Sequence, residues 1–414
     1  MNTMRKTAST HILLTLALVM LTVPSFADWP QRRGPMNDGI STETHWSHDW
    51  PEEGPRVLWK GSVGIGFSAV AISSYRAFTI GNFNDQDAVV CLNAMTGEAL
   101  WKFAYPEPLN PKMYEGGPNS TPTVSDDKLL VVSRTGKLLC LQKGSGTLVW
   151  SNNLAVYVEK DNGNWGAGGS PVVRGSNVFV NYGSAMVAVD LSSGRAVWQS
   201  AKDPKGKHSF TSAVFSSDSS DPILLAHMNK ALFALAPADG RELWRHPFGS
   251  GYETHATDPV ITSTGVFISS GDDGGELISF SSGKETRLWK NKNLGTFTGT
   301  AVLVGRHLYG VDSGSYKKGK QELRCVDLEK GEVKWSLPGF GQDSLIAAGD
   351  RLIVLTERGE LVIAKAVPDQ GRVLARAQVI GGKCWTQPTL SDGLLYCRNA
   401  RGQVVCLDLR KPGA

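Results

Sequence analysis

The chain has 414 residues, of which 41% are hydrophobic and 20% charged, and this composition excludes a disordered polypeptide. The formal net charge is only +4 and no run of basic residues occurs, so we expect no nucleic-acid partner. The length suggests two or three domains, unless an internal repeat overrides that estimate.

Residues 1–27 are predicted to be a cleaved signal peptide. Arg5 and Lys6 form a short basic region, the apolar run 12–23 follows, and Ser25-Phe26-Ala27 is a small-x-small cleavage site. The apolar run is short for a membrane span, although an uncleaved anchor is the alternative. We therefore expect an exported chain, periplasmic or extracellular, with no transmembrane segment after cleavage.

Residues 28–55 are predicted to be an extended lead-in. Their Pro and Gly content, as in Trp29-Pro30, argues against a regular helix or strand. We expect the tryptophans of this segment to pack on the domain that follows.

A repeated unit organises residues 56–414. The copy from Cys91 to Trp101 predicts a strand, a tight turn at Thr96-Gly97 and a second strand closed by tryptophan. The closing position recurs at intervals of 42, 49, 48, 46, 45, 46 and 40 residues. A period in the forties with four short strands per unit is typical of a β-propeller blade. The closing residues are Trp59, Trp101, Trp150, Trp198, Trp244, Trp289, Trp335 and a degenerate Ala375, and the turn glycines are Gly97, Gly146, Gly194, Gly240, Gly283 and Gly331.

Counting the units predicts how the ring closes. Seven strand sets lie between Trp59 and Ala375, and an eighth, beginning at Gln387, has no outer strand of its own. The segment 56–60 is an outer strand without a blade, and joining it to the eighth set leaves no unpaired edge at the seam. We predict an all-β, eight-bladed propeller of four-stranded antiparallel blades, closed by the N-terminal strand and monomeric.

The repeat tryptophans and most cysteines are predicted to be structural. Each tryptophan should pack against the next blade. Cys91, Cys140, Cys325 and Cys406 share one repeat position, where other units carry small residues, so we interpret them as buried small hydrophobes. Cys384 and Cys397 lie on adjacent predicted strands, and a disulfide between them remains open.

The unit Ala/Cys-Leu-Asp-x-x-x-Gly-x-x-x-Trp resembles the quinoprotein-type, or PQQ-like, propeller repeat. Two families share it: the quinoprotein alcohol and glucose dehydrogenases, and the non-catalytic propeller subunit of the outer-membrane β-barrel assembly machinery. The lead-in Asp28 to Pro35 resembles a subgroup of exported bacterial PQQ-like propellers. Fold alone does not decide between these functions.

The dehydrogenase resemblance implies a quinone held between a tryptophan and a disulfide of adjacent cysteines, with calcium and an Asp base beside it. This sequence has no adjacent cysteines, and it is much shorter than those enzymes. We therefore expect no catalytic residues and no cofactor, and PQQ with calcium belongs only to the alternative, a small PQQ-dependent oxidoreductase.

The segments that precede each innermost strand are the candidate ligand-binding region, because such loops surround the mouth of a propeller channel. They include Phe67 and Phe210, and most combine an aromatic residue with a polar neighbour, as ligand pockets do. The alternative is that the aromatic side chains merely fill the channel. The candidate residues are Tyr114, Glu115, Asn119, Trp165, His208, Tyr252, Glu253, His255, Phe297, Gln342, Asp343 and Trp385.

Glu253, His255 and Asp258 form the densest ionisable cluster. Ligands confined to one loop are a weak metal signature, and we predict no metal site. The sequence therefore favours an exported, non-catalytic scaffold that binds a protein, a peptide or a small molecule at the channel mouth. A carbohydrate ligand is a further possibility, suggested by the aromatic residues alone.

Overall fold

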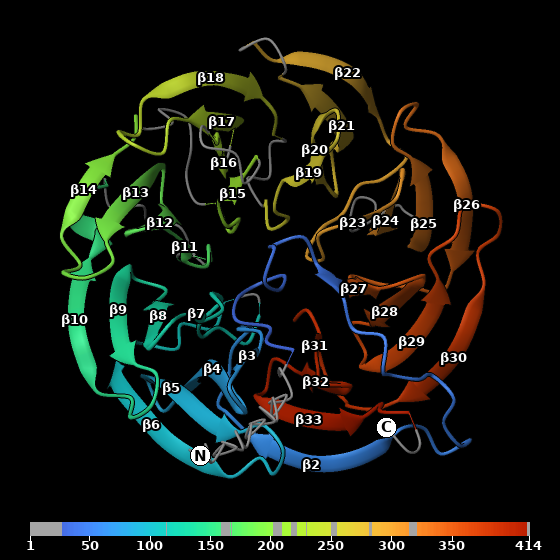
Figure 1. Ribbon diagram of the computed structural model, residues 1–414, viewed down its shortest axis with the longest axis horizontal. Coiled ribbons are helices and arrows are strands. Elements are labelled where there is room, and N and C mark those ends of the chain that lie inside the picture. Colours follow the sequence, from blue (N-terminus) through green and yellow to red (C-terminus); the bar gives the residue numbers. More distant parts are fainter. Residues whose placement is uncertain are drawn as a thin grey trace, which may run out of the picture.

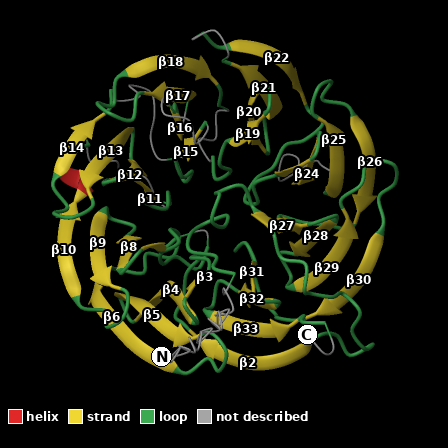
Figure 2. Ribbon diagram, viewed as in Figure 1, coloured by secondary structure: helices red, strands yellow, loops and turns green. Residues whose placement is uncertain are grey.

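The computed structural model describes residues 27–112, 114–158, 166, 168–201, 209–216, 222–228, 230–249, 255–280, 284–313 and 321–411. Their strands form eight sheets around a central axis (Figure 1), so the predicted eight-bladed, all-β propeller is confirmed. Figure 2 shows that strands dominate, and the helix drawn is the short 3-10 turn η1 (Leu154–Val156).

Each blade has four antiparallel strands that run from an innermost to an outermost strand, and the lead-in adds a fifth, parallel strand to blade 7. Blade 1 is β3 (Ala71–Ser73), β4 (Arg76–Phe83), β5 (Gln86–Asn93) and β6 (Ala99–Pro106). Blade 2 is β7 (Thr123–Ser125), β8 (Lys128–Val132), β9 (Lys137–Gln142) and β10 (Leu148–Asn153). Blade 3 is β11 (Val172–Arg174), β12 (Asn177–Tyr182), β13 (Ala185–Asp190) and β14 (Ala196–Gln199). Blade 4 is β15 (Val214–Phe215), β16 (Leu224–Met228), β17 (Ala231–Leu235) and β18 (Glu242–Pro247).

The second half of the ring repeats this pattern. Blade 5 is β19 (Val260–Thr262), β20 (Gly265–Ser270), β21 (Gly274–Ser279) and β22 (Thr286–Asn291). Blade 6 is β23 (Val302–Val304), β24 (His307–Asp312), β25 (Glu322–Asp327) and β26 (Val333–Pro338). Blade 7 is β27 (Ser344–Ala348), β28 (Arg351–Leu355), β29 (Glu360–Lys365) and β30 (Val373–Gln378), and blade 8 is β31 (Thr389–Ser391), β32 (Leu394–Arg398) and β33 (Gln403–Asp408) with β2 (Arg56–Ser62) outermost.

The N-terminal strand closes the ring as predicted. Strand β2 pairs antiparallel with β33, from Arg56 opposite Asp408 to Ser62 opposite Gln403. The outer strand of blade 8 therefore comes from the beginning of the chain, and the seam leaves no unpaired edge.

The lead-in contains a strand, whereas the sequence predicts an extended segment without a regular helix or strand. Strand β1 (Ile40–Ser41) pairs in parallel with β27, placing Ile40 opposite Ala347. The prediction was wrong here because the Pro and Gly residues that break regular structure lie on either side of β1, between Pro30 and Gly39 and between Pro51 and Pro55. Two extended residues suffice to extend a sheet whose innermost edge is otherwise unpaired.

The lead-in crosses the middle of the ring before it reaches the seam (Figure 1). Trp29 exchanges two backbone hydrogen bonds with Ile72 of blade 1, at 2.9 and 2.8 Å. The buried Arg33 donates to the carbonyl of Ala301 in blade 6 at 3.1 Å. Asn37 donates to the carbonyl of Ala213 in blade 4 at 3.2 Å. The segment thus bridges blades on opposite sides of the axis.

Six repeat tryptophans pack against the turn of the next blade, which explains the glycine in the repeat, whereas Trp244 Nε1 has no hydrogen-bond partner among the described residues. Trp101 Nε1 donates to the carbonyl of Lys143 at 3.1 Å. Gly146 in the same turn has φ of 73°, and a Cβ there would lie 2.5 Å from the Trp101 ring. Both the left-handed backbone and the flat ring require a residue without a side chain. Equivalent tryptophan hydrogen bonds are made by Trp59, Trp150, Trp198, Trp289 and Trp335. Gly283 lies outside the described residues.

The cysteines of the repeat occupy the position directly opposite a tryptophan. Cys91 pairs with Trp101 and Cys406 with Trp59, while Ala188 holds the same place opposite Trp198. A small residue is needed there because the indole ring occupies the space beside it. All six cysteines are free and buried, so Cys384 and Cys397 are not bridged.

A belt of hydrogen bonds beside the channel joins successive blades from blade 1 to blade 6. In each step a backbone N–H just before one innermost strand donates to a side-chain oxygen at the same place in the next blade. The acceptors are Thr121, Ser170, Ser212, Asp258 and Thr300, at distances between 2.7 and 3.2 Å. Blade 5 differs from the others because its belt residue, Asp258, is a carboxylate.

A buried arginine reinforces the seam between blades 8 and 1. Arg398 Nη1 donates to the carbonyls of Ser68 at 2.6 Å and Ile80 at 2.8 Å and to Thr79 Oγ1 at 2.5 Å. Its Nη2 donates to the carbonyl of Gly64 at 3.0 Å. Burial lowers the pKa of Arg398 to about 9, so the side chain remains a cation at neutral pH.

Candidate functional site

The loops that lead into the innermost strands meet at one mouth of the channel and enclose a cavity of about 170 Å³. We call this cavity the cup. Its described lining comes from the lead-in and from segments before or within blades 1 to 6 and 8. The lining residues are Arg32, Phe67, Asn110, Lys112, Tyr114, Gly116, Gly117, Asn119, Arg134, Gly168, Phe210, Ala256, Phe297, Thr298 and Trp385.

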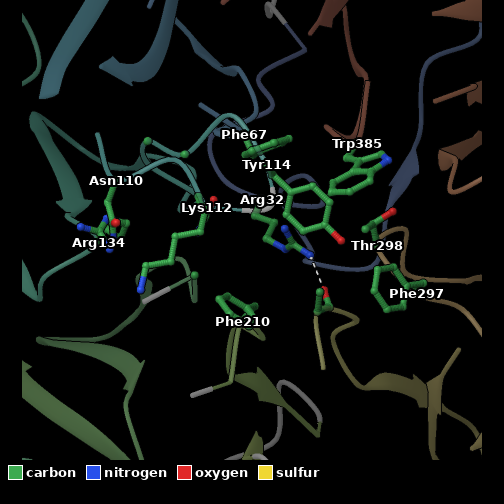
Figure 3. Close-up of a pocket in the computed structure, with 15 residues that line it drawn as sticks. Arg32, Phe67, Asn110, Lys112, Tyr114, Arg134, Phe210, Phe297, Thr298 and Trp385 are labelled. Atoms are coloured by element: carbon green, nitrogen blue, oxygen red, sulfur yellow. Dashed lines mark hydrogen bonds between the residues drawn. The ribbon is translucent and has the colours of Figure 1, made fainter. Parts of the chain in front are cut away.

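Aromatic side chains form one side of the cup. Phe67 stacks on Trp385 with 5.7 Å between ring centroids, and Tyr114 meets Trp385 edge-on at 4.6 Å. Figure 3 shows these three rings together, with Phe210 across the cup from them. All of these rings are half-buried, so part of their apolar surface remains open to a ligand.

Local backbone geometry brings the loops of blades 1 and 2 close enough to place Tyr114 beside Trp385. Gly117 has φ of 84°, and a Cβ there would lie 2.5 Å from the carbonyl oxygen of Ile65. The amide of Phe67 donates to the carbonyl of Pro118 at 2.8 Å. Only glycine permits this approach without strain, so Gly117 positions the aromatic side of the cup.

The lead-in supplies Arg32, which lies in the middle of the cup (Figure 3). Arg32 Nε donates to the buried carboxylate of Asp258 at 2.7 Å, and Nη2 donates to the carbonyl of Ala256 at 3.2 Å. Asp258 is itself held by the amide of Ser212 at 2.7 Å. The carboxylate in the belt of blade 5 therefore fixes the arginine of the lead-in at the centre of the channel.

A lysine borders the aromatic side from outside the cavity. Lys383 Nζ lies 4.6 Å from the centroid of Tyr114 and 4.8 Å from that of Trp385, and it pairs with Glu115 at 3.0 Å. Cation–π contacts and the ion pair together hold the rims of blades 2 and 8 in one arrangement.

The structure brings part of the predicted site together. Tyr114, Asn119, Phe297 and Trp385 line the cup. Glu115 borders it through its pair with Lys383. The predicted residues Trp165, His208, Tyr252 and Glu253 lie outside the described residues.

Three predicted site residues are buried away from the described lining of the cup. The carboxylate of Asp343 accepts the amides of Gly341 at 2.9 Å and Glu357 at 2.7 Å, and burial raises its pKa to about 6. Its neighbour Gln342 is buried in the same loop. His255 packs against His227 with 4.4 Å between ring centroids. Burial and the adjacent His255 hold the pKa of His227 well below its usual value.

Sequence reasoning missed the basic side chains of the cup. Arg32 belongs to the lead-in that the sequence predicts to be extended, Lys112 stands outside the repeat, and Arg134 lies in the turn between β8 and β9. The Arg32-Arg33 pair was visible, but nothing local shows that this segment returns to the channel. Asp258 was grouped with Glu253 and His255, whereas it belongs to the belt and pairs with Arg32.

The described residues do not fit the quinone and calcium site that the dehydrogenase resemblance implies. Trp385 provides an aromatic face, but every cysteine is free and none lines the cup. Within the described part of the chain, no carboxylate lines the cup and no group of three or more His, Cys, Asp or Glu residues is placed to hold a metal ion. We therefore derive no redox step through this cavity.

The fold and the cup define the class of protein as an eight-bladed PQQ-like propeller with a ligand-sized cavity at its mouth. A family model described as "Outer membrane protein assembly factor BamB" matches residues 85–337, more than half of the chain. The chain belongs to this family.

Individual relatives agree with this assignment. The outer membrane protein assembly factor BamB of Shewanella oneidensis is 24% identical over 277 residues, which span 64% of this chain and 64% of that protein. The crystal structure of BamB from Moraxella catarrhalis matches 86% of this chain and 99% of that chain, at 15% identity and a TM-score of 0.63. Quinohemoprotein alcohol dehydrogenase from Comamonas testosteroni shares the fold, with a TM-score of 0.70, 12% identity and coverage of 93% of this chain and 81% of that chain. The aligned region thus spans less than two thirds of the curated relative.

In the described part of the chain, no helix is long and apolar enough to cross a membrane.

Proposed function

We propose that the protein is an exported, non-catalytic scaffold of outer-membrane protein assembly that engages a polypeptide partner at the mouth of the propeller. Membership of the assembly-factor family supports the role, and the signal-peptide pattern of residues 1–27 supports export to the periplasm. The cup is the observation that supports a binding site at the mouth of the propeller. Half-buried aromatic rings from several blades converge there on a rigid ring.

The geometry suits recognition of a polypeptide. Side chains of a flexible partner insert between aromatic walls, while charged groups at the rim fix their orientation. The pair Glu115–Lys383 and the cation Lys112 stand at or near this rim. Partner binding needs no catalytic group, which agrees with a scaffold.

Complementation in the native host tests the role. Deleting the gene should lower the amount of folded, heat-modifiable outer-membrane barrels, and the wild-type gene should restore it. Unchanged barrel content after deletion would contradict the assembly role. The double variant Phe297→Ala/Trp385→Ala should fail to restore it, whereas Lys334→Gln on outer strand β26 should succeed. Full restoration by the double variant would place the binding surface elsewhere.

A further inference from the structure

The cup is divided into an aromatic side and a cationic side. Figure 3 shows Phe67, Tyr114 and Trp385 on one side, Arg134 and Lys112 on the other, and Arg32 between them. Among the described lining residues there are three cations and no carboxylate. Glu115, the nearby acid, is paired with Lys383 rather than placed in the lining.

The cations differ in how far protein groups already neutralise them. Arg32 is matched by the buried carboxylate of Asp258. Arg134 is within electrostatic reach of the buried carboxylate of Asp87, but its Nε is buried and has no hydrogen-bond partner among the described residues. The Arg134 side chain as a whole is half-buried and lines the cup, so the terminal nitrogens of its guanidinium, and not the shielded Nε, would donate to an oxyanion in the cup.

Neighbouring backbone holds Arg134 in place. A Cβ on Gly166, whose φ is 70°, would lie 2.6 Å from the carbonyl oxygen of Arg134 and would also overlap its side-chain stem. Gly166 therefore packs directly on Arg134. The side chain is thus positioned for binding before a ligand arrives, which reduces the entropy lost on association.

The volume of the cup limits the apolar part of a ligand. A cavity of about 150 Å³ lined by apolar side chains accommodates benzene. The cup, at about 170 Å³, is of similar size and is open at the mouth. It suits one aromatic ring or a group of similar size rather than an extended ring system.

From this arrangement we infer that the cup binds a carboxylate attached to a single flat apolar group, with the ring against Trp385 and Tyr114 and the carboxylate toward Arg134. Two sources share this chemistry: a free aromatic acid, and the C-terminus of a polypeptide that ends in an aromatic residue. The inference deepens the proposed function because it names the group that the mouth recognises.

The test is a ligand-observed NMR titration of the purified protein in low salt. Phenylacetate is compared with phenylacetamide, and acetyl-Gly-Gly-Phe with its C-terminal amide. In at least one pair the acid should bind about tenfold more tightly than the amide, as expected for one charge-assisted contact. Acid-selective binding by phenylacetate but not by the peptide identifies free acids as the source, and acid-selective binding by the peptide identifies a polypeptide terminus.

Substitutions in the cup test which residues contact the carboxylate and the ring of the ligand. Arg134→Gln should weaken binding of the acid about tenfold and leave binding of the amide unchanged. Trp385→Ala should weaken both. The matched control is Arg195→Gln, which removes the same charge from an exposed turn of blade 3.

Equal affinities for acid and amide in both pairs, or equal behaviour of Arg134→Gln and Arg195→Gln, would overturn the inference. Both results are obtained with the isolated protein and leave the complementation result in the host untouched. Failure of the ligand assignment is therefore distinguishable from failure of the scaffold role.

Discussion

Replacing Arg398 by methionine should destabilise the ring at its seam. Methionine fills the space of the aliphatic stem but takes a donor from the buried carbonyls of Ser68, Ile80 and Gly64, of which Ser68 keeps a long hydrogen bond from Thr79 Oγ1 at 3.3 Å. Each buried acceptor that loses its hydrogen bond costs about 1–3 kcal/mol of stability, whereas removing a buried charge recovers part of that cost. The expected net loss in the free energy of unfolding is about 3 kcal/mol. With an unfolding entropy of about 2.1 cal/mol/K per residue, the melting temperature of this chain should fall by about 4 °C.

Urea unfolding followed by tryptophan fluorescence measures this loss. The matched control is Arg401→Met, which changes an exposed residue in the turn between β32 and β33. The control should unfold at the wild-type midpoint, and Arg398→Met should unfold at a clearly lower one. Equal midpoints for the two variants would refute the reasoning that Arg398 holds blade 8 against blade 1.

Two further substitutions test the packing of the repeat and the pH dependence of stability. Gly146→Ala should lower the free energy of unfolding in urea by about 2–4 kcal/mol, because the backbone is left-handed there and the new Cβ would lie 2.5 Å from the Trp101 ring. The control Gly144→Ala, with open space around it, should lower it by less than about 1 kcal/mol. Equal losses for the two variants would contradict the packing of Trp101 against Gly146. Burial alone would raise the pKa of Glu276, but hydrogen bonds from His246 and Lys290 lower it to about 2, below the unfolded value of 4.5. The ionised Glu276 therefore stabilises the fold by about 2–3 kcal/mol above about pH 4.5, and this contribution is lost as the pH falls toward 2. The difference in urea midpoint between wild type and Glu276→Gln should accordingly shrink from pH 6 to pH 3.5. A difference that stays constant with pH would contradict the lowered pKa of Glu276.

The blades were predictable because their determinants are local and repeated. The turn that contains Gly146 and the Trp101 ring that packs on it belong to adjacent blades, yet most blades carry both a turn glycine and a closing tryptophan, so periodicity alone reveals them. Small residues such as Cys91 follow from the same geometry, since they face the tryptophan across one strand pair.

The path of the lead-in was not predictable, because its contacts are distant in sequence. Arg32 and Asp258 are 226 residues apart, and β1 pairs with a strand that begins at Ser344. A two-residue strand has no periodicity to detect. The belt was missed for a related reason: Ser, Thr and Asp before a strand look like ordinary turn residues until the blades are superimposed.

The aromatic half of the cup was partly predictable, whereas its cationic half was not. Tyr114, Phe297 and Trp385 occur in segments that the repeat places at the channel mouth. Arg134 lies in a turn between the second and third strands of blade 2, where a charged residue ordinarily faces solvent. Its position beside Gly166 depends on a loop of the neighbouring blade.

The mouth with the cup is the face that we propose engages a partner. Photo-crosslinking in the native host tests this directly, with p-benzoylphenylalanine placed either at Tyr114 in the cup or at Tyr75 in the turn between β3 and β4, at the opposite end of the innermost strand. We predict adducts with a component or substrate of outer-membrane protein assembly at position 114 and none at position 75. Adducts at position 75 alone, or equal adducts at both positions, would contradict the account.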